Sequence, residues 1–169
     1  MAKDEADTDA FIKEFREELS TIDEFVQVVL NSHFVVERDL DGVLAAIFYH
    51  PERLERTELR FMQKVHLARA FTWNMNEMDD WALIAKLNAL RNEVVHKRRN
   101  ELANKIFGEL RAMLLDKGTE KFRKDVQAAS AKDVIVYAAA TCGGFLAHLE
   151  DHAKQMRKVL EEAAVPTDG

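Results

Sequence analysis

The stretch of this chain with the most chemical potential is Arg91-Asn92-Glu93-Val94-Val95-His96, in which an arginine and a histidine are separated by four residues. An arginine guanidinium stays charged at physiological pH and can hold a phosphate through two parallel hydrogen bonds. A histidine imidazole is the side chain that most readily exchanges a proton near neutral pH. Cleavage of RNA without a metal ion requires these two kinds of group. Arg91 and His96 are therefore candidate catalytic residues.

Each polar residue of this stretch has an expected role in such a reaction. A neutral His96 accepts the proton of a ribose 2′-hydroxyl, which attacks the adjacent phosphate. Arg91 stabilises the charge that develops on the phosphoryl oxygens. Asn92 orients His96 or a phosphate oxygen. Three basic side chains that follow are expected to bind the flanking phosphates of an RNA strand: Lys97, Arg98 and Arg99.

The helix expected from Asp80 to Lys97 constrains how these groups can meet. One face carries the apolar residues Leu83, Leu87, Leu90 and Val94, and another carries Asn88, Asn92 and His96. At about 100° per residue, Arg91 points about 140° away from His96. The two can serve one phosphate if the helix end loosens near Lys97, or if a second copy contributes across a two-fold axis. The chemistry therefore predicts a homodimer.

The segment from Leu87 to His96 resembles the signature helix of the HEPN superfamily, in which an Arg, a polar residue (often Asn), a few further residues and a His form the motif. The preceding segment, Phe61 to Ala70, is similar to the one before that helix in the mannitol-repressor-like branch. The similarity covers roughly residues 20 to 115. The last third of the chain has no comparable signature.

The resemblance implies an antiparallel helical bundle, a homodimer and, in many members, metal-independent endoribonuclease activity in a defence or stress system. The mannitol-repressor-like branch implies instead a non-enzymatic module that regulates through a partner protein, its Arg–His helix shaping a dimer interface. Both functions stay open at this stage. This chain departs from the toxins in having Val94-Val95 where Phe-Ala is often found, and in lacking a nucleotidyltransferase-like partner domain.

Composition predicts an all-α protein. The 169 residues are 47% apolar and 32% charged, as in a globular protein with a sizeable core. Only two prolines and six glycines occur, which favours long helices. We expect a single helical domain over residues 8–164, a bundle of five to seven helices, between disordered tails at residues 1–7 and 165–169.

Charge and cysteine content limit the partners and the compartment. A net charge of −6 argues against sequence-blind coating of nucleic acid, although a local basic patch can still bind RNA, and it disfavours a DNA-binding regulator. Cys142 is the single cysteine, so no internal disulfide forms. Residues 1–9 do not resemble a signal peptide, and the longest uncharged run, residues 134–147, is too short to cross a bilayer. These features predict a cytoplasmic protein without membrane association.

Capping residues predict the helix boundaries. Apolar residues at helical spacing predict one helix from Thr8 to about Tyr49, or a second helix capped within it by Ser20-Thr21-Ile22-Asp23. His50-Pro51 then breaks the pattern. The remaining boundaries are expected at Thr57 (a cap), Asp79 or Asp80 (a start), Gly118 (an end), Thr119 (a cap) and Ser130, which opens a last helix reaching about Ala164.

Other candidate sites carry less chemistry. His148 and His152 have the i,i+4 spacing of metal-binding helices, but Leu149 stands where a zincin needs Glu, so a solvated face is expected. We expect no metal and no cofactor. Arg60 and His66 also form an Arg–His pair, with Phe61 where the motif has a polar residue. Trp73 and Trp81 offer a recognition platform, although core or dimer contacts are the usual role of aromatic residues near helix ends. Phe107 and Phe145 are expected in the core, and Cys142 is expected to be a buried, inert thiol.

Overall fold

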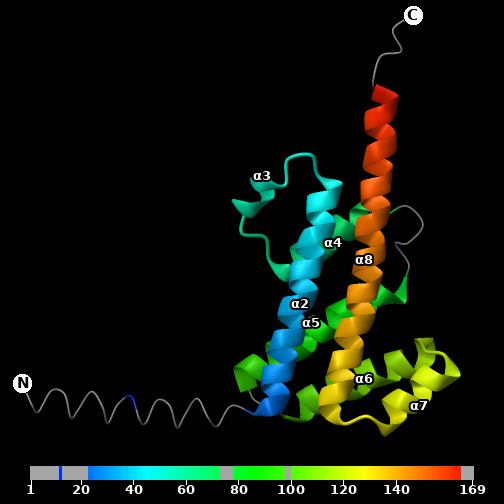
Figure 1. The fold of residues 1–169 in the computed structure, drawn as a ribbon. Helices are drawn as coiled ribbons and strands as arrows, with labels where there is room; N and C mark the ends of the chain where they lie inside the picture. The colour runs from blue at the N-terminus through cyan, green and yellow to red at the C-terminus, as the bar shows by residue number, and fades with distance from the viewer. Residues whose placement is uncertain (1–11, 13–22, 73–77, 98–99, 165–169) are drawn as a thin grey trace, which may run out of the picture.

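The computed structural model describes residues 12, 23–72, 78–97 and 100–164, and over these residues the chain forms helices and no strand (Figure 1). This confirms the all-α bundle. The helices within the described part are α2 (Glu24–Ile47), α3 (Glu52–Glu55), α4 (Phe61–Phe71), α5 (Asp79–Lys97), α6 (Glu101–Lys117), α7 (Glu120–Ala128) and α8 (Ala131–Ala164).

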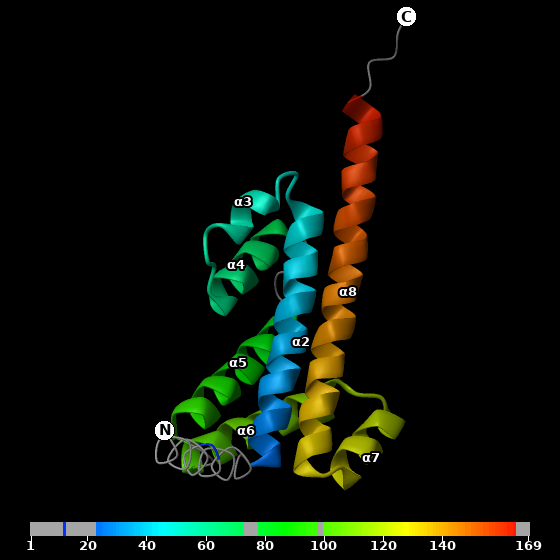
Figure 2. The same cartoon turned by 60° about the vertical axis from the view of Figure 1, so that its left-hand side comes forward.

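The two longest helices, α2 and α8, lie side by side and run in the same direction (Figures 1 and 2). Lys132 near the start of α8 pairs with Glu24, the first residue of α2, 108 positions earlier. The same offset relates Gly42 to Glu150, whose carboxylate lies against that glycine. The bundle is thus built on a parallel central pair, whereas the family resemblance implied antiparallel packing.

Gly143 allows the close approach of α8 to α2. A Cβ atom at this position would lie 3.1 Å from Oδ2 of Asp39 on α2. Two adjacent glycines, Gly143 and Gly144, can kink a helix or permit a close contact with a neighbouring helix. The described helix runs without a break from Ala131 to Ala164, and the close contact is the outcome.

Helix α5 crosses the α2–α8 pair and completes the core with α6 packed against it (Figure 2). Its apolar stripe is buried as predicted, and it meets apolar side chains from both long helices. Trp81, at the start of α5, is buried with its ring edge-on to Phe145 of α8, at a centroid distance of 4.9 Å. The largest fully buried side chains include Leu83, Ile84, Leu87 and Leu90 of α5, Val29, Val36 and Leu40 of α2, and Ile135 and Leu146 of α8.

Most predicted caps are confirmed. The Asp23 carboxylate accepts a hydrogen bond from the Phe25 backbone N–H at 2.8 Å, so the last residue of the predicted capping segment is itself the N-cap and α2 begins at Glu24. The start predicted at Thr8 lies outside the described residues. Thr119 caps α7, and the Ser130 hydroxyl accepts from the Asp133 N–H at 3.2 Å at the start of α8.

The cap predicted at Thr57 is wrong. Helix α4 begins at Phe61, and the Thr57 hydroxyl instead donates to the Leu54 carbonyl oxygen at 2.7 Å, closing the turn after α3. The reason is the backbone of Glu58, whose φ of 46° lies in the left-handed region and interrupts any right-handed helix there. The chain resumes helical geometry only after Arg60.

The described helices also test the membrane and thiol predictions. None of them is both long enough and apolar enough to span a bilayer. Cys142 is fully buried in α8, as expected for a structural thiol. Phe145 is buried and Phe107 is half-buried, with its ring edge-on to Phe25.

Candidate functional site at the crossing of α2 and α5

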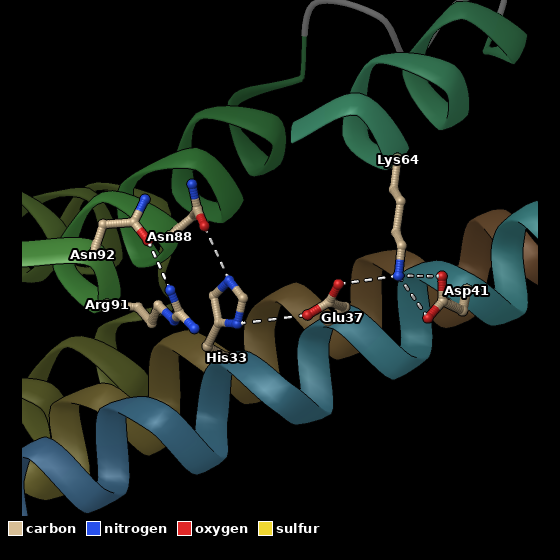
Figure 3. A network of polar contacts seen from close by, with 7 residues as sticks. All are labelled: His33, Glu37, Asp41, Lys64, Asn88, Arg91 and Asn92. Carbon is tan, nitrogen blue, oxygen red and sulfur yellow. Dashed lines mark hydrogen bonds and ion pairs between the residues drawn. The ribbon is translucent and has the colours of Figure 1, made fainter. Parts of the chain in front are cut away.

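Arg91 and Asn92, the first two predicted site residues, contact each other on the surface of α5. The Arg91 Nη1 atom donates to Asn92 Oδ1 at 3.1 Å (Figure 3). Asn92 is exposed and Arg91 is half-buried. A guanidinium carries five N–H donors, and this bond uses one of them. The arrangement therefore orients a cation that can still bind a phosphate.

The other predicted site residues lie at the end of α5 or beyond it. His96 and Lys97 are in its last turn, where their backbone is helical but their side chains lie outside the described part. Arg98 and Arg99 lie outside the described residues altogether. Because α5 is helical as far as Lys97, positions 91 and 96 face directions about 140° apart.

Asn100 is the N-cap of α6 and directly follows the predicted RNA-binding residues in the chain. Its side-chain oxygen accepts from the Ala103 N–H at 2.8 Å and caps α6. Its side-chain nitrogen donates to Glu93 Oε1 on α5 at 2.7 Å. One asparagine thus caps α6 and ties its start to α5.

His33 of α2 is a site residue that the sequence did not reveal. Its Nε2 atom lies 3.0 Å from Oδ1 of Asn88, one helical turn before Arg91 and Asn92. His33 is 6% exposed, and its ring lies against the Phe61 ring of α4, with centroids 4.3 Å apart. An amide oxygen accepts hydrogen bonds, so the hydrogen of the ring belongs on Nε2. The Arg91 guanidinium lies beside this imidazole (Figure 3).

A row of charged groups continues from His33 toward α4 (Figure 3). Glu37, one turn later on α2, has a carboxylate oxygen 3.9 Å from His33 Nδ1. Its other oxygen accepts from Lys64 Nζ on α4 at 3.0 Å. The same ammonium donates to Asp41 Oδ2 at 2.9 Å. The polar network therefore joins α2 to both α4 and α5.

The surroundings set the charge of each titrating group. Burial lowers the pKa of His33 below 6.5, and the cations of Arg91 and Lys64 lower it further, against the opposing effects of Asn88 and Glu37. The imidazole is therefore neutral at pH 7. Burial opposes the charge of Lys64, but its bonds to Asp41 and Glu37 outweigh that effect and raise its pKa. Lys64 therefore remains a cation.

A neutral imidazole beside a guanidinium offers a proton acceptor and an anion clamp. His33 itself is buried and its Nε2 is bonded to Asn88. Its role is therefore to hold α5, the helix that carries Arg91, in a fixed orientation. The signal in the sequence was the pair Ser32-His33 between Val29 and Val36, where two polar residues fall on a buried helix face.

The remaining candidates do not form sites in the described part of the chain. His148 and His152 are exposed, and no three His, Cys, Asp or Glu side chains among the described residues come together as metal ligands would. His66 is likewise exposed. Trp73 lies outside the described residues. Burial raises the pKa of the Cys142 thiol to about 12, so it is inert as a nucleophile.

Comparisons with known proteins assign no family to this chain. Searches with protein-family models, curated proteins and solved structures find no match to the chain.

Proposed function

We propose that this chain is a HEPN-like, dimeric, metal-independent endoribonuclease of a defence or stress system that acts in the cytoplasm. Arg91 is the phosphate clamp, His96 is the base, and Asn92 orients the reacting groups. The observation that carries the proposal is the Arg91–Asn92 contact of 3.1 Å on the surface of α5. It holds a guanidinium at the surface, five positions before a histidine in the last turn of the same helix.

The proposed reaction is an intramolecular transesterification of RNA. His96 takes the proton of the 2′-hydroxyl, a bond forms between that oxygen and phosphorus, and the bond from phosphorus to the 5′-oxygen breaks. The leaving 5′-oxygen takes a proton from an imidazolium or from water. Arg91 stabilises the extra negative charge on the phosphoryl oxygens. The products are a 2′,3′-cyclic phosphate and a 5′-hydroxyl end.

The angle between positions 91 and 96 makes a second copy part of the proposal. On one regular helix the two side chains leave in directions about 140° apart, whereas a two-fold axis can bring His96 of one copy to Arg91 of the other. Lys97, Arg98 and Arg99 then bind the phosphates on either side of the cleaved one. A local patch of this kind suits a protein whose overall charge is −6.

The buried contact between His33 and Asn88 helps to orient this site. Asn88 belongs to the same polar face of α5 as Asn92, and its bond to His33 fixes the rotation of that face relative to α2. Catalytic electrostatics depend on groups that are already oriented before the reaction. In this proposal His33 is a positioning residue and does not touch the RNA.

Cleavage of labelled RNA by the purified protein in EDTA tests the proposal. The parent should cleave, His96→Ala should not, and the matched control His66→Ala, which changes an exposed histidine of α4, should cleave like the parent. An oligonucleotide with a 2′-deoxyribose at the cleaved position should resist, because the nucleophile is missing. Equal cleavage by the parent and by His96→Ala would refute the assignment.

A second function is favoured by apolar side chains near the site. Val95, directly before His96, is 45% exposed, and Phe34, directly after His33, is 69% exposed. Exposed apolar residues of this kind can contact another protein. The alternative is a non-enzymatic regulatory module that binds a partner protein through this face. Absence of cleavage by the parent, together with a partner complex that Phe34→Lys abolishes, would establish this alternative in place of the nuclease.

A further inference from the structure

A cavity of about 360 Å³ opens to the surface between the end of α2, the short helix α3 and the start of α4. The chain around α3 arches away from α2 before it returns as α4 (Figure 1). Hydrogen bonds shape this part of the chain, since the Leu54 carbonyl oxygen accepts from the Thr57 hydroxyl at 2.7 Å and the Leu54 N–H donates to the Pro51 carbonyl oxygen at 2.8 Å. The volume of the cavity is within the usual range of small-molecule sites, about 300–1,000 Å³.

Five of the side chains that line the cavity are apolar. Leu44 of α2 is 4% exposed, and Leu54 and Leu59 are half-buried. Ala45 and Pro51 complete this apolar part of the wall. These side chains can remove the apolar part of a ligand from water, which is a main source of affinity in small-molecule sites.

The single cation that lines the cavity, Lys64, is already paired. Its Nζ atom lies 2.8 Å from Oδ1 and 2.9 Å from Oδ2 of Asp41, and it donates to Glu37 Oε1 at 3.0 Å (Figure 3). An ammonium group has three N–H donors, and three carboxylate oxygens surround this one. Lys64 is therefore not available to bind an anionic ligand.

The Glu58 carboxylate lines the same cavity and is available to a ligand. Glu58 is exposed, and within the described part of the chain no hydrogen bond or ion pair engages its side chain. The lining thus holds two carboxylates, Asp41 and Glu58, against one ammonium, and Glu37 adds a third negative charge to that ammonium. The charge of the cavity is therefore complementary to a cation.

We propose that this cavity binds a small organic amine, with a protonated amino group attached to an apolar body. The ammonium group of the ligand donates to the Glu58 carboxylate and to acceptor sites of Asp41 that Lys64 leaves open, since a carboxylate offers about four such sites. The apolar body packs against Leu44, Leu54 and Leu59. A metal ion is a poorer occupant, because the described residues bring no three His, Cys, Asp or Glu side chains together as ligands.

This inference does not depend on RNA cleavage. Neither Arg91 nor His96 lines the cavity, and its walls belong to α2, α4 and the segment around α3. Amine binding can therefore be measured whether or not the protein cleaves RNA, and each proposal can fail without the other.

Isothermal titration calorimetry of the full-length protein with phenethylamine tests the proposal. This probe carries one ammonium group on an apolar body, and it should bind saturably at one site near pH 7. Two compounds of similar shape, the neutral phenethyl alcohol and the anion hydrocinnamate, should bind at least about tenfold more weakly, because each lacks the charge-assisted hydrogen bonds of the amine. Equal affinity for the three probes, or no saturable binding of phenethylamine up to millimolar concentrations, would overturn the proposal.

Substitutions at the rim locate the binding site. Glu58→Gln should weaken phenethylamine binding about fivefold, the upper range for one exposed ion pair. The matched control Glu52→Gln changes an exposed carboxylate of α3 that does not line the cavity, and should bind the probe like the parent. Ala45→Phe should abolish binding by filling the cavity, with circular dichroism showing that the variant is folded.

Glu58→Gly separates a binding role from a structural one. Glycine accepts the left-handed backbone of this position, where φ is 46°, so the substitution should not lower the unfolding temperature. It should nevertheless weaken phenethylamine binding as much as Glu58→Gln does. Parent affinity in either Glu58 variant would overturn the proposal.

Discussion

The Nε2 atom of His33 lies 3.0 Å from the Oδ1 atom of Asn88, and this contact joins two helices whose residues are 55 positions apart in the chain. It is made where α5 crosses α2, and His33 is buried there. A buried polar pair of this kind fixes one rotational setting of a helix, because other settings leave both groups unsatisfied. The setting that it fixes determines where Arg91 points.

Asn88→Leu should destabilise the protein. The substitution leaves the His33 Nε2–H buried without an acceptor, which costs about 1–3 kcal/mol of unfolding free energy. The exposed neighbour Asn92→Leu is the matched control and should change stability by less than about 0.5 kcal/mol. Urea denaturation of both variants measures the difference. An equal loss in both would show that the His33 contact does not stabilise the crossing.

The stability of the protein should fall as the pH drops below 6.5. Burial, Arg91 and Lys64 hold the pKa of His33 below its usual 6.5, so the unfolded chain binds a proton at this residue before the folded chain does. The free energy of unfolding therefore decreases from pH 6.5 downward and levels off, for this residue, below the folded pKa. Urea denaturation between pH 7.5 and 5 should show a shallower dependence for His33→Gln. Parallel curves for parent and variant would refute the role of His33.

The parts of the fold that could be predicted from the sequence are those that depend on residues close together in the chain. Helix type, the apolar stripe of α5 and the caps at Asp23, Thr119 and Ser130 depend on residues close together in the chain, and periodicity and capping rules describe such local effects well. The error at Thr57 arose because the left-handed backbone of Glu58 intervenes, and nothing in the residue type of a glutamate announces it.

The candidate site also has a part that the sequence predicted and a part that it did not. Arg91 and Asn92 were predicted because they share one helix and one short motif. His33 was missed because its importance depends on Asn88 and Phe61, which other helices bring to it. The parallel direction of α2 and α8 could not be predicted either, because helical periodicity specifies which face of a helix is buried but not the direction of the helix that packs on it.

Arg91→Ala should reduce RNA cleavage by about 10²–10³-fold, the usual cost of removing one preorganised donor from a developing oxyanion. Arg91→Lys should recover only part of this loss, because an ammonium lacks the planar fork that holds two phosphate oxygens. Single-turnover cleavage rates measure the effect, and thermal melting checks that both variants are folded. A lysine variant with the full parent rate would exclude a two-point contact.

The Cys142 thiol should react only when the protein unfolds. It is fully buried, and its pKa of about 12 leaves almost no thiolate at neutral pH. Modification by a thiol reagent at pH 7.5 should be slow without denaturant and rapid in concentrated urea. Fast labelling of the native protein would mean that α8 opens locally around Cys142.

Asn100→Ala should cost about 0.5–2 kcal/mol of unfolding free energy, the usual range for the loss of a helix cap. It also breaks the bond to Glu93 at 2.7 Å, which ties the start of α6 to α5 next to the predicted RNA-binding residues. RNA affinity should therefore fall in this variant, whereas Thr119→Ala, which removes the cap of α7, should leave affinity near that of the parent. Affinity can be compared by filter binding at one salt concentration.

The parallel pairing of the first described helix with the last has a consequence for synthesis in the cell. A ribosome must produce Lys132 before Glu24 can meet it, and must release most of α8 before the apolar side of α2 is covered. Until then the emerging chain exposes a long apolar surface. This surface is buried late and slowly, because the contacts that cover it join segments far apart in the chain. We expect nascent chains that stop before α8 to be substrates for chaperones, and C-terminal truncations to be removed by proteases.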